Sequence, residues 1–147
     1  MELDETDIKI LKNLLVDARQ SARQLAYKLG ISTVTMISRI KKLEQKKIIK
    51  GYSVQLDHEV LGYEISAIIE VTTRHGKMLE IEQKIAERDN ICAVYDVTGR
   101  ADIVLIGKFR TRQDLSDFIK NLSSIPDVED TVTHVVLNTI KEDFRLI

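Results

Sequence analysis

This chain of 147 residues has little of what several protein classes require. Its single cysteine, Cys92, excludes an internal disulfide framework and a zinc site built from several cysteines. Uncharged runs such as Ile31–Ser38 are too short to cross a bilayer. The N-terminal segment MELDETDIK is acidic, unlike the positively charged start of a secretory signal. We therefore expect no membrane segment and a cytoplasmic location.

Signatures of catalysis and metal binding are also missing. His58, His75 and His134 lie far apart, with no repeated spacing to a cysteine or to one another. No Ser/His/Asp set, carboxylate pair or phosphate-binding loop stands out. The sequence thus predicts no metal, no cofactor and no enzyme. Cys92 lies in an apolar run and is expected in the core.

What the chain does have is an uneven distribution of charge. Residues 1–50 carry 11 basic and 6 acidic side chains, a net of +5, and residues 51–147 carry 11 basic and 17 acidic, a net of −6. Residues 21–50 alone hold eight Lys or Arg against one acid, Glu44. Each basic side chain at a phosphate releases condensed counterions, so such a basic head is typical of nucleic-acid binding.

The basic head has the pattern of three short helices. Asp4, Ser21 and Ser32 each precede apolar residues at helical spacing and are predicted to cap a helix. Gln24 occupies the capping-box position, and Gly30 can take the positive φ that ends a helix. The second and third helices then form a winged or plain helix-turn-helix, whose second helix enters the major groove.

The third helix presents an outward stripe once Met36 and Leu43 face the core. A solvated face is one interpretation, but Val34 and Ile37 would then be apolar and exposed for no reason. In a groove they can meet thymine methyls, and nearby hydroxyls can bond base edges or phosphates. Arg39 lies beside the core face, where it suits phosphate or packing better than a base. The predicted DNA-contacting residues are Ser32, Thr33, Val34, Thr35, Ile37, Ser38, Arg39, Lys41, Lys42, Lys46 and Lys47.

Beyond a predicted strand (Ile48–Leu56) and hinge (Asp57–Gly62), the apolar period changes from helical to alternating. Strands are predicted at 65–72, 91–98, 102–109 and 131–140, with helices from Met78 and after a cap at Thr111. This βαββαβ order fits a ferredoxin-like sandwich of four antiparallel strands with both helices on one face, so the fold class is α+β.

The third of these strands is apolar on both sides, with Ile103 and Leu105 on one and Val104 and Ile106 on the other. An antiparallel sheet with one solvated face should alternate cleanly. A second layer is therefore expected, and the chain has no element left to supply it. We predict that a second copy of the same sheet supplies it.

Five segments together resemble the Lrp/AsnC feast/famine transcription regulators over essentially the whole chain: LDETDIKIL, LAYKLGIS, RIKKLEQKKIIKGY, LGY and VTGRADIVL. The resemblance implies a head for double-stranded DNA and a ligand-sensing body that dimerises through its sheet, assembles into tetramers or octamers, and binds an amino acid between dimers. The domains expected are a helix-turn-helix domain (1–50), a linker strand and hinge (51–63), and an effector-binding and oligomerisation domain (64–147).

In that family, ligand atoms dock on the turn between the second and third strands. A glycine there exposes an N–H suited to a carboxylate, and an aspartate suits an ammonium. Many members have an aromatic residue before the aspartate, where this chain has Ala101. Alternatively, Gly99 serves only the turn and Asp102 only caps its own backbone. The predicted effector residues are Thr98, Gly99, Arg100, Ala101 and Asp102, with Thr131 and Thr133 from the last strand.

Two other functions stay open. An architectural DNA-binding protein without an effector would have the same fold, and its ratio of specific to non-specific affinity would distinguish it. An enzyme similar to siroheme decarboxylases would use His134, Tyr95 and Arg100, but would have little need for a basic third helix. Bound tetrapyrrole would give that enzyme an absorption band.

Overall fold

The computed structural model describes residues 3–74 and 78–147. The chain divides into two compact units, Met1–Gln55 with Glu142–Ile147, and Leu56–Lys141. Each unit has its own hydrophobic core. Within the described residues, no helix combines the length and the apolar character needed to cross a membrane.

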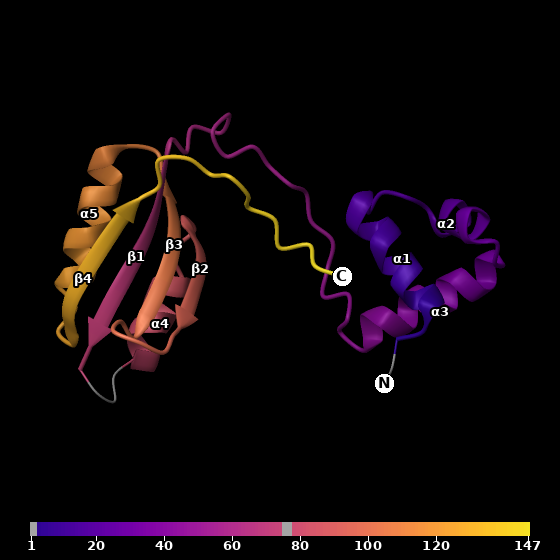
Figure 1. The fold of residues 1–147 in the computed structure, drawn as a ribbon, viewed down its shortest axis with the longest axis horizontal. Coiled ribbons are helices and arrows are strands. Elements are labelled where there is room, and N and C mark those ends of the chain that lie inside the picture. The colour runs from indigo at the N-terminus through magenta and orange to yellow at the C-terminus, as the bar shows by residue number, and fades with distance from the viewer. Residues whose placement is uncertain (1–2, 75–77) are drawn as a thin grey trace. The chain divides into compact units, whose positions relative to one another are not determined.

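The first unit is built from three helices, α1 (Glu5–Val16), α2 (Ala22–Leu29) and α3 (Thr33–Gln45) (Figure 1). Their facing sides share one core, in which the side chains of Ile10, Leu25, Met36 and Leu43 are almost completely buried. The inward face predicted for α3 is therefore confirmed. The C-terminal residues 142–147 belong to this unit, where Arg145 Nη1 donates to the Leu15 carbonyl oxygen at 3.3 Å.

The ends of these helices form as the sequence predicts. The Asp4 carboxylate accepts from the Asp7 N–H at 2.8 Å, and the Ser32 hydroxyl accepts from the Thr35 N–H at 3.0 Å. Ser21 and Gln24 form the reciprocal capping box at the start of α2. Gly30 ends α2 with φ of 67°, a left-handed conformation that glycine adopts without steric cost.

The segment Ile48–Leu56 forms no strand, contrary to the prediction. A strand needs a neighbour to complete its backbone hydrogen bonds, and among the described residues the only sheet is the four-stranded one of the second unit. The apolar side chains that alternate along the segment are consequently exposed, including Tyr52, Val54 and Leu56. The first unit is thus a helix-turn-helix without a wing strand in the described part.

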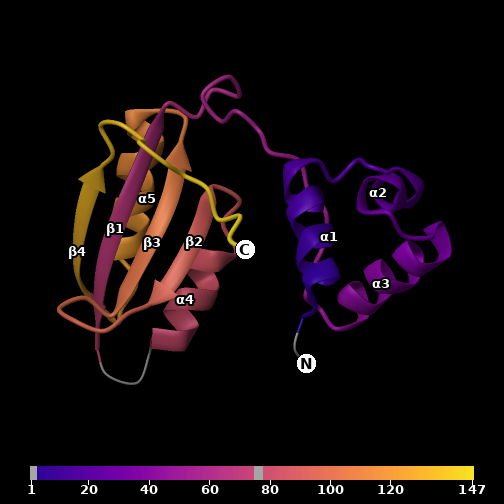
Figure 2. The same cartoon turned by 45° about the vertical axis from the view of Figure 1, so that its right-hand side comes forward.

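The second unit is a ferredoxin-like sandwich with the predicted βαββαβ order. Its sheet has the order β2-β3-β1-β4, and every neighbouring pair is antiparallel. Both helices lie on the same face of the sheet (Figure 2). The elements are β1 (Ile65–Thr73), α4 (Met78–Ala86), β2 (Ile91–Asp96), β3 (Ile103–Phe109), α5 (Arg112–Ser123) and β4 (Val128–Val135).

The two faces of this sheet have different surroundings. On the helix side, Ile69, Val71, Ile103 and Leu105 are completely buried. The opposite face, called the open face below, is only partly covered although it is rich in apolar side chains. It presents Ile68, Tyr95, Val104, Ile106 and Val132, together with a His134–Glu70 contact at 3.0 Å.

Three local predictions in this unit are wrong. β2 ends at Asp96 rather than Thr98, because its pairing with β3 ends where Asp96 lies opposite Ile103. β4 runs from Val128 to Val135 rather than over 131–140, because its partner β1 pairs with it only from Thr73 to Ala67. The apolar residues that follow, among them Leu137 and Ile140, are exposed. Cys92 is exposed rather than in the core, because an irregularity between Ile91 and Ala93 interrupts the regular alternation of β2.

Candidate nucleic-acid interface and effector site

The outward face of α3 carries the predicted pattern of apolar and hydroxyl side chains. Val34 is 78% exposed and Ile37 41% exposed, although both are large apolar residues. Thr33 and Ser38 are also exposed beside them. Because the opposite side of the helix is fixed in the core by Met36 and Leu43, this face is held rigidly toward solvent. It has the composition that base edges and thymine methyls require.

The start of α3 is already organised by its own hydroxyls. Ser32 Oγ accepts from the Thr35 N–H and lies 2.8 Å from Thr35 Oγ1. These two predicted DNA-contacting residues therefore serve as the helix cap in the free protein. Each hydroxyl oxygen can still form a further hydrogen bond, for example with DNA.

Arg39 has partners within the first unit. Its Nη1 lies 2.6 Å from Asp4 Oδ2 and 2.8 Å from Asp7 Oδ1, so it joins α3 to the start of α1. This hydrogen bond from Arg39 holds the pKa of the Asp4 carboxyl below its ordinary value of 3.8. Arg39 thus lies beside the core face as predicted, but its partners Asp4 and Asp7 were not predicted from the sequence.

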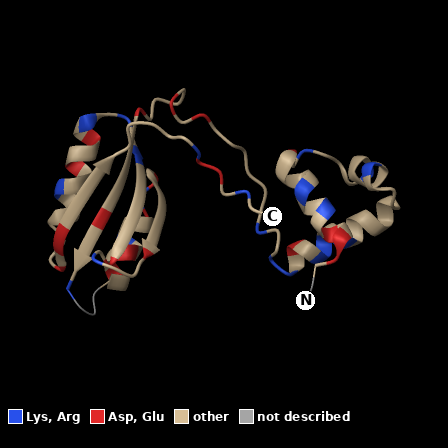
Figure 3. Cartoon of the chain, in the orientation of Figure 1, with Lys and Arg blue, Asp and Glu red and all other residues tan. Residues whose placement is uncertain are grey.

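The basic cluster lies at the end of α3 and just after it (Figure 3). All its lysines are exposed: Lys41, Lys42, Lys46, Lys47 and Lys50. Lys47 has φ of 55°, and its N–H donates to the Glu44 carbonyl oxygen at 2.8 Å as the helix ends. Several cations on one short segment make it suited to a phosphate backbone.

The predicted effector turn connects β2 and β3. Thr98, Gly99 and Arg100 are exposed, Gly99 has φ of 130°, and Ala101 is buried. The Asp102 side chain bonds to Thr73 rather than to the backbone of its own turn: its Oδ2 accepts from the Thr73 N–H at 2.7 Å and lies 3.2 Å from Thr73 Oγ1. The turn is thereby attached to the end of β1. Oδ1 makes no hydrogen bond with the described residues, so one acceptor stays available.

Thr131 and Thr133 lie apart from this turn within one chain. They belong to β4, and β1 separates β4 from β3. Thr131 pairs with Val71 and its Oγ1 lies 3.3 Å from Ser123 Oγ, so it points to the helix side of the sheet. The two threonines therefore do not complete the turn in a single copy.

Comparison with known proteins identifies the family. Residues 3–44 match the AsnC-type helix-turn-helix domain, and residues 66–146 match the Lrp/AsnC ligand binding domain. The chain belongs to the Lrp/AsnC family of transcriptional regulators. The resemblance noted in the sequence is thus confirmed over both units.

Individual Lrp/AsnC relatives match over almost the whole chain. An uncharacterized HTH-type transcriptional regulator of Pyrococcus furiosus is 48% identical over 99% of each chain. The HTH-type transcriptional regulator FL11 of Pyrococcus horikoshii is 36% identical over 98% of this chain and 95% of its own. A Neisseria meningitidis regulator solved as its L-Met complex has a TM-score of 0.91 at 28% identity, covering 99% of this chain and 97% of its own.

The residues considered for an enzyme are not brought together in this Lrp/AsnC chain. Tyr95 lies on β2 and His134 on β4, at opposite edges of the sheet, and Arg100 lies in the exposed effector turn. Among the described residues there is no group of three or more His, Cys, Asp or Glu side chains that could hold a metal. His75 lies outside the described residues.

Proposed function

We propose that this Lrp/AsnC regulator reads duplex DNA with the exposed face of α3 and holds the phosphate backbone with the lysines that follow it. The single observation that carries the proposal is that Val34 and Ile37 are exposed on a helix whose other side is buried. Base readout is assigned to Thr33, Val34, Ile37 and Ser38. Backbone contact is assigned to Lys41, Lys42, Lys46 and Lys47, and Ser32 and Thr35 are assigned to the cap and neighbouring phosphates.

The open face of the sheet supports a dimer in this proposal. Its partly exposed apolar residues, such as Ile68, Val104 and Ile106, form a continuous patch across the two central strands. A second copy of the same face would bury this patch under two-fold symmetry. Further assembly of dimers would place the effector turns near residues of another copy, including Thr131 and Thr133.

An α-amino acid is the effector we propose for the turn at Thr98–Asp102. The exposed backbone at Gly99 suits a carboxylate, and Asp102 Oδ1 is available for an ammonium. The L-Met complex of the Neisseria meningitidis regulator supports this ligand class. Ala101 is buried and small, so the ligand side chain must find its pocket elsewhere, at the boundary with another copy.

Selection of binding sites from random DNA, repeated with each standard amino acid present, tests the function. A sequence preference that an amino acid alters is the expected result. Uniform affinity for all DNA, unaffected by amino acids, would instead identify an architectural protein.

Two kinds of variant then test the assignment on α3. Ser38→Ala or Ile37→Ala should change the preferred base at one position, at a cost of about 1–3 kcal/mol. Lys46→Ala with Lys47→Ala should weaken all sequences alike and reduce the salt slope by about one to two. Lys120→Ala, at an exposed position of α5, is the control for loss of a lysine elsewhere. If the lysine pair changed the preferred base and the α3 variants did not, the groove assignment would be wrong.

A further inference from the structure

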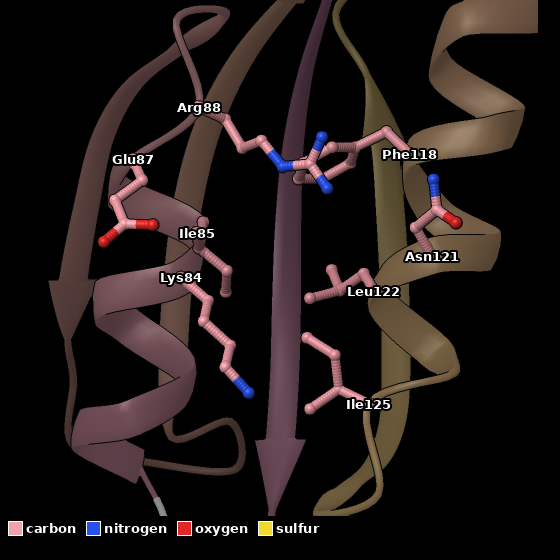
Figure 4. A pocket seen from close by; sticks show the side chains of 8 residues that line it. All are labelled: Lys84, Ile85, Glu87, Arg88, Phe118, Asn121, Leu122 and Ile125. Carbon is pink, nitrogen blue, oxygen red and sulfur yellow. The ribbon is translucent and has the colours of Figure 1, made fainter.

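A hollow of about 440 Å³ lies between α4 and α5, on the helix side of the sheet (Figure 4). Its floor is apolar, because Ile85 and Leu122 are buried there and Phe118 and Ile125 are half-buried beside them. The volume is within the range of small-molecule sites in proteins. The effector turn contributes none of the residues that line it.

Two cations that have no partner among the described residues border this floor. Lys84 and Arg88 form no ion pair and no side-chain hydrogen bond with the residues that the structure describes. Figure 4 shows the Arg88 guanidinium reaching across the hollow toward Phe118, and the Lys84 ammonium pointing into it. The Asn121 side chain, on the α5 side, is likewise without a hydrogen bond in the described structure.

The acid at this rim does not neutralise the two cations. Glu87 also lines the hollow, but its carboxylate points away from it in Figure 4. A second hollow of about 340 Å³ shares Arg88, Phe118 and Asn121 with the first and extends toward Asp114 and Asp117. Lys108 and Arg110 line it as well, but both have partners there: Lys108 Nζ lies 3.4 Å from Ser66 Oγ, and Arg110 Nη1 donates to the Leu61 carbonyl oxygen at 2.7 Å. These two cations are thus engaged, and the two carboxylates repel an anion. The favourable end therefore lies between Lys84 and Arg88.

We propose that the groove between α4 and α5 binds a small amphipathic monocarboxylate without an ammonium group, such as a short branched fatty acid or a 2-oxo acid. Arg88 and Lys84 hold the carboxylate, since a guanidinium matches its geometry with two parallel hydrogen bonds. The hydrocarbon lies on Ile85, Leu122 and Ile125. An amino acid is disfavoured because no acid at this end points inward to pair with an ammonium. The proposal is independent of the effector proposed for the turn.

Methyl-detected NMR of the full-length chain, labelled at isoleucine and leucine, tests the site with 4-methylpentanoate as the probe. Saturable shifts are expected at Ile85, Leu122 and Ile125. The uncharged 4-methylpentanamide and the amino acid leucine should each bind at least about tenfold more weakly. The amide has no carboxylate for the two cations, and the ammonium of leucine is repelled by them. Saturable shifts at Ile103, next to the effector turn, with none in the groove would overturn the proposal, as would no saturable shift at millimolar probe concentration.

Variants separate the charged rim from the fold. Lys84→Gln with Arg88→Gln should weaken binding of 4-methylpentanoate about tenfold or more. Glu87→Gln, beside them on the same rim but with its carboxylate turned away, should leave binding unchanged. Asn121→Trp should fill the hollow and abolish binding. All these positions are exposed, so thermal unfolding should stay near that of the parent chain. Equal binding by the parent, the double variant and Asn121→Trp would refute the site.

Discussion

Asp102 has a structural partner as well as a proposed ligand. Its Oδ2 accepts from the N–H of Thr73, which is only 7% exposed. Asp102→Ala would leave that buried N–H unpaired, so we expect the free energy of unfolding to fall by about 1–3 kcal/mol. Asp102→Asn keeps an oxygen acceptor and removes the charge, and should retain stability while losing affinity for an α-ammonium. Chemical denaturation measures the first effect and calorimetry with the standard amino acids the second.

The two Asp102 variants answer different questions. An amino acid that bound Asp102→Asn as tightly as the parent chain would show that its ammonium has another partner. If Asp102→Ala were as stable as the parent, the Thr73 N–H would have to find a different acceptor. The asparagine variant is therefore the one to use for effector binding, because the alanine variant changes the fold and the site together.

Arg39 should make stability depend on acid pH. Its hydrogen bond holds the folded-state pKa of Asp4 below 3.8, so the carboxylate stabilises the folded state above that pH. The stabilisation is lost as the pH falls through the lower, folded-state pKa. Arg39→Ala should unfold at a lower temperature than the parent at pH 7, and the two melting temperatures should converge as the pH falls below 3.8 and the Asp4 carboxylate is protonated. Thermal melts across this range measure the difference.

Lys9→Ala is the control for this measurement. Lys9 pairs with Glu5 at 2.7 Å on the exposed side of α1, whereas the ion pairs of Arg39 in the described structure are with Asp4 and Asp7. Its removal should have a smaller effect at pH 7, because exposed pairs four residues apart contribute little. A gap between Arg39→Ala and the parent that did not narrow in acid would mean that Arg39 acts through packing instead.

Local and distant partners explain which residue roles the sequence could predict. Asp4, Ser21, Ser32 and Thr111 cap helices through residues three positions away, so a short motif contains the whole interaction. Arg39 binds carboxylates 32 and 35 positions away. Sequence spacing does not show that approach, since it depends on how α1 and α3 pack.

At the scale of elements, the chain that leads into β1 is fixed by Arg110. Arg110 Nη1 donates to the Leu61 carbonyl oxygen at 2.7 Å, and its guanidinium lies 4.5 Å from the centre of the Tyr63 ring. Gly62, between Leu61 and Tyr63, has φ of 85°, and a Cβ on this residue would lie 3.0 Å from Arg110 Nη1. The end of the predicted hinge is therefore a defined turn that is held by the side chain of Arg110, the residue directly after β3.

Gly62→Ala should be destabilising for two reasons. A left-handed conformation costs a side-chain-bearing residue about 1–2 kcal/mol, and the added methyl also displaces Arg110. Gly51→Ala is the matched control, because nothing lies within 4 Å of its Cβ position and its φ is not in that region. Denaturation of both variants gives the comparison. Equal effects would show that Arg110 and the turn shape are not constraining.

Strand prediction succeeded where a partner strand lies in the same chain. β1 and β3 alternate in sequence and lie side by side, so pattern and pairing agree. The segment 48–56 alternates equally well, but it pairs with no strand in the described part of the chain and stays irregular. β4 stops where β1 stops, although its apolar residues continue. Strand limits are thus set by the neighbouring strand, which the pattern of one segment does not contain.

At the scale of the whole molecule, charge and apolar surface together define the proposed assembly. Residues 1–50 have a net charge of +5 and residues 51–147 a net charge of −6, so the DNA-binding part and the acidic body carry opposite net charge. Two copies joined through the open face would bring two basic heads into one particle. The proposed dimer therefore predicts an operator with two half-sites, one for each basic head.

Ile106→Lys should therefore impair both assembly and DNA binding. The substitution places a charge in the centre of the open face, opposite Ile68, and burial of an unpaired charge between two copies is costly. Light scattering should show a smaller particle, and affinity for the selected duplex should fall about a hundredfold or more because the two heads no longer bind as one unit. Leu79→Lys, at an exposed position of α4, is the control and should change neither.

The symmetry of the operator is the remaining consequence. A two-fold dimer should protect a pseudo-palindrome whose half-sites lie about 34–36 Å apart, one helical turn, or a multiple of that distance. The footprint of the parent chain should thus contain two equivalent halves. Ile106→Lys should need a higher protein concentration to protect even a single half-site. A parent footprint with a single unrepeated half-site would contradict the dimer. So would full affinity of Ile106→Lys for the whole operator, since the open face would then contribute nothing to binding.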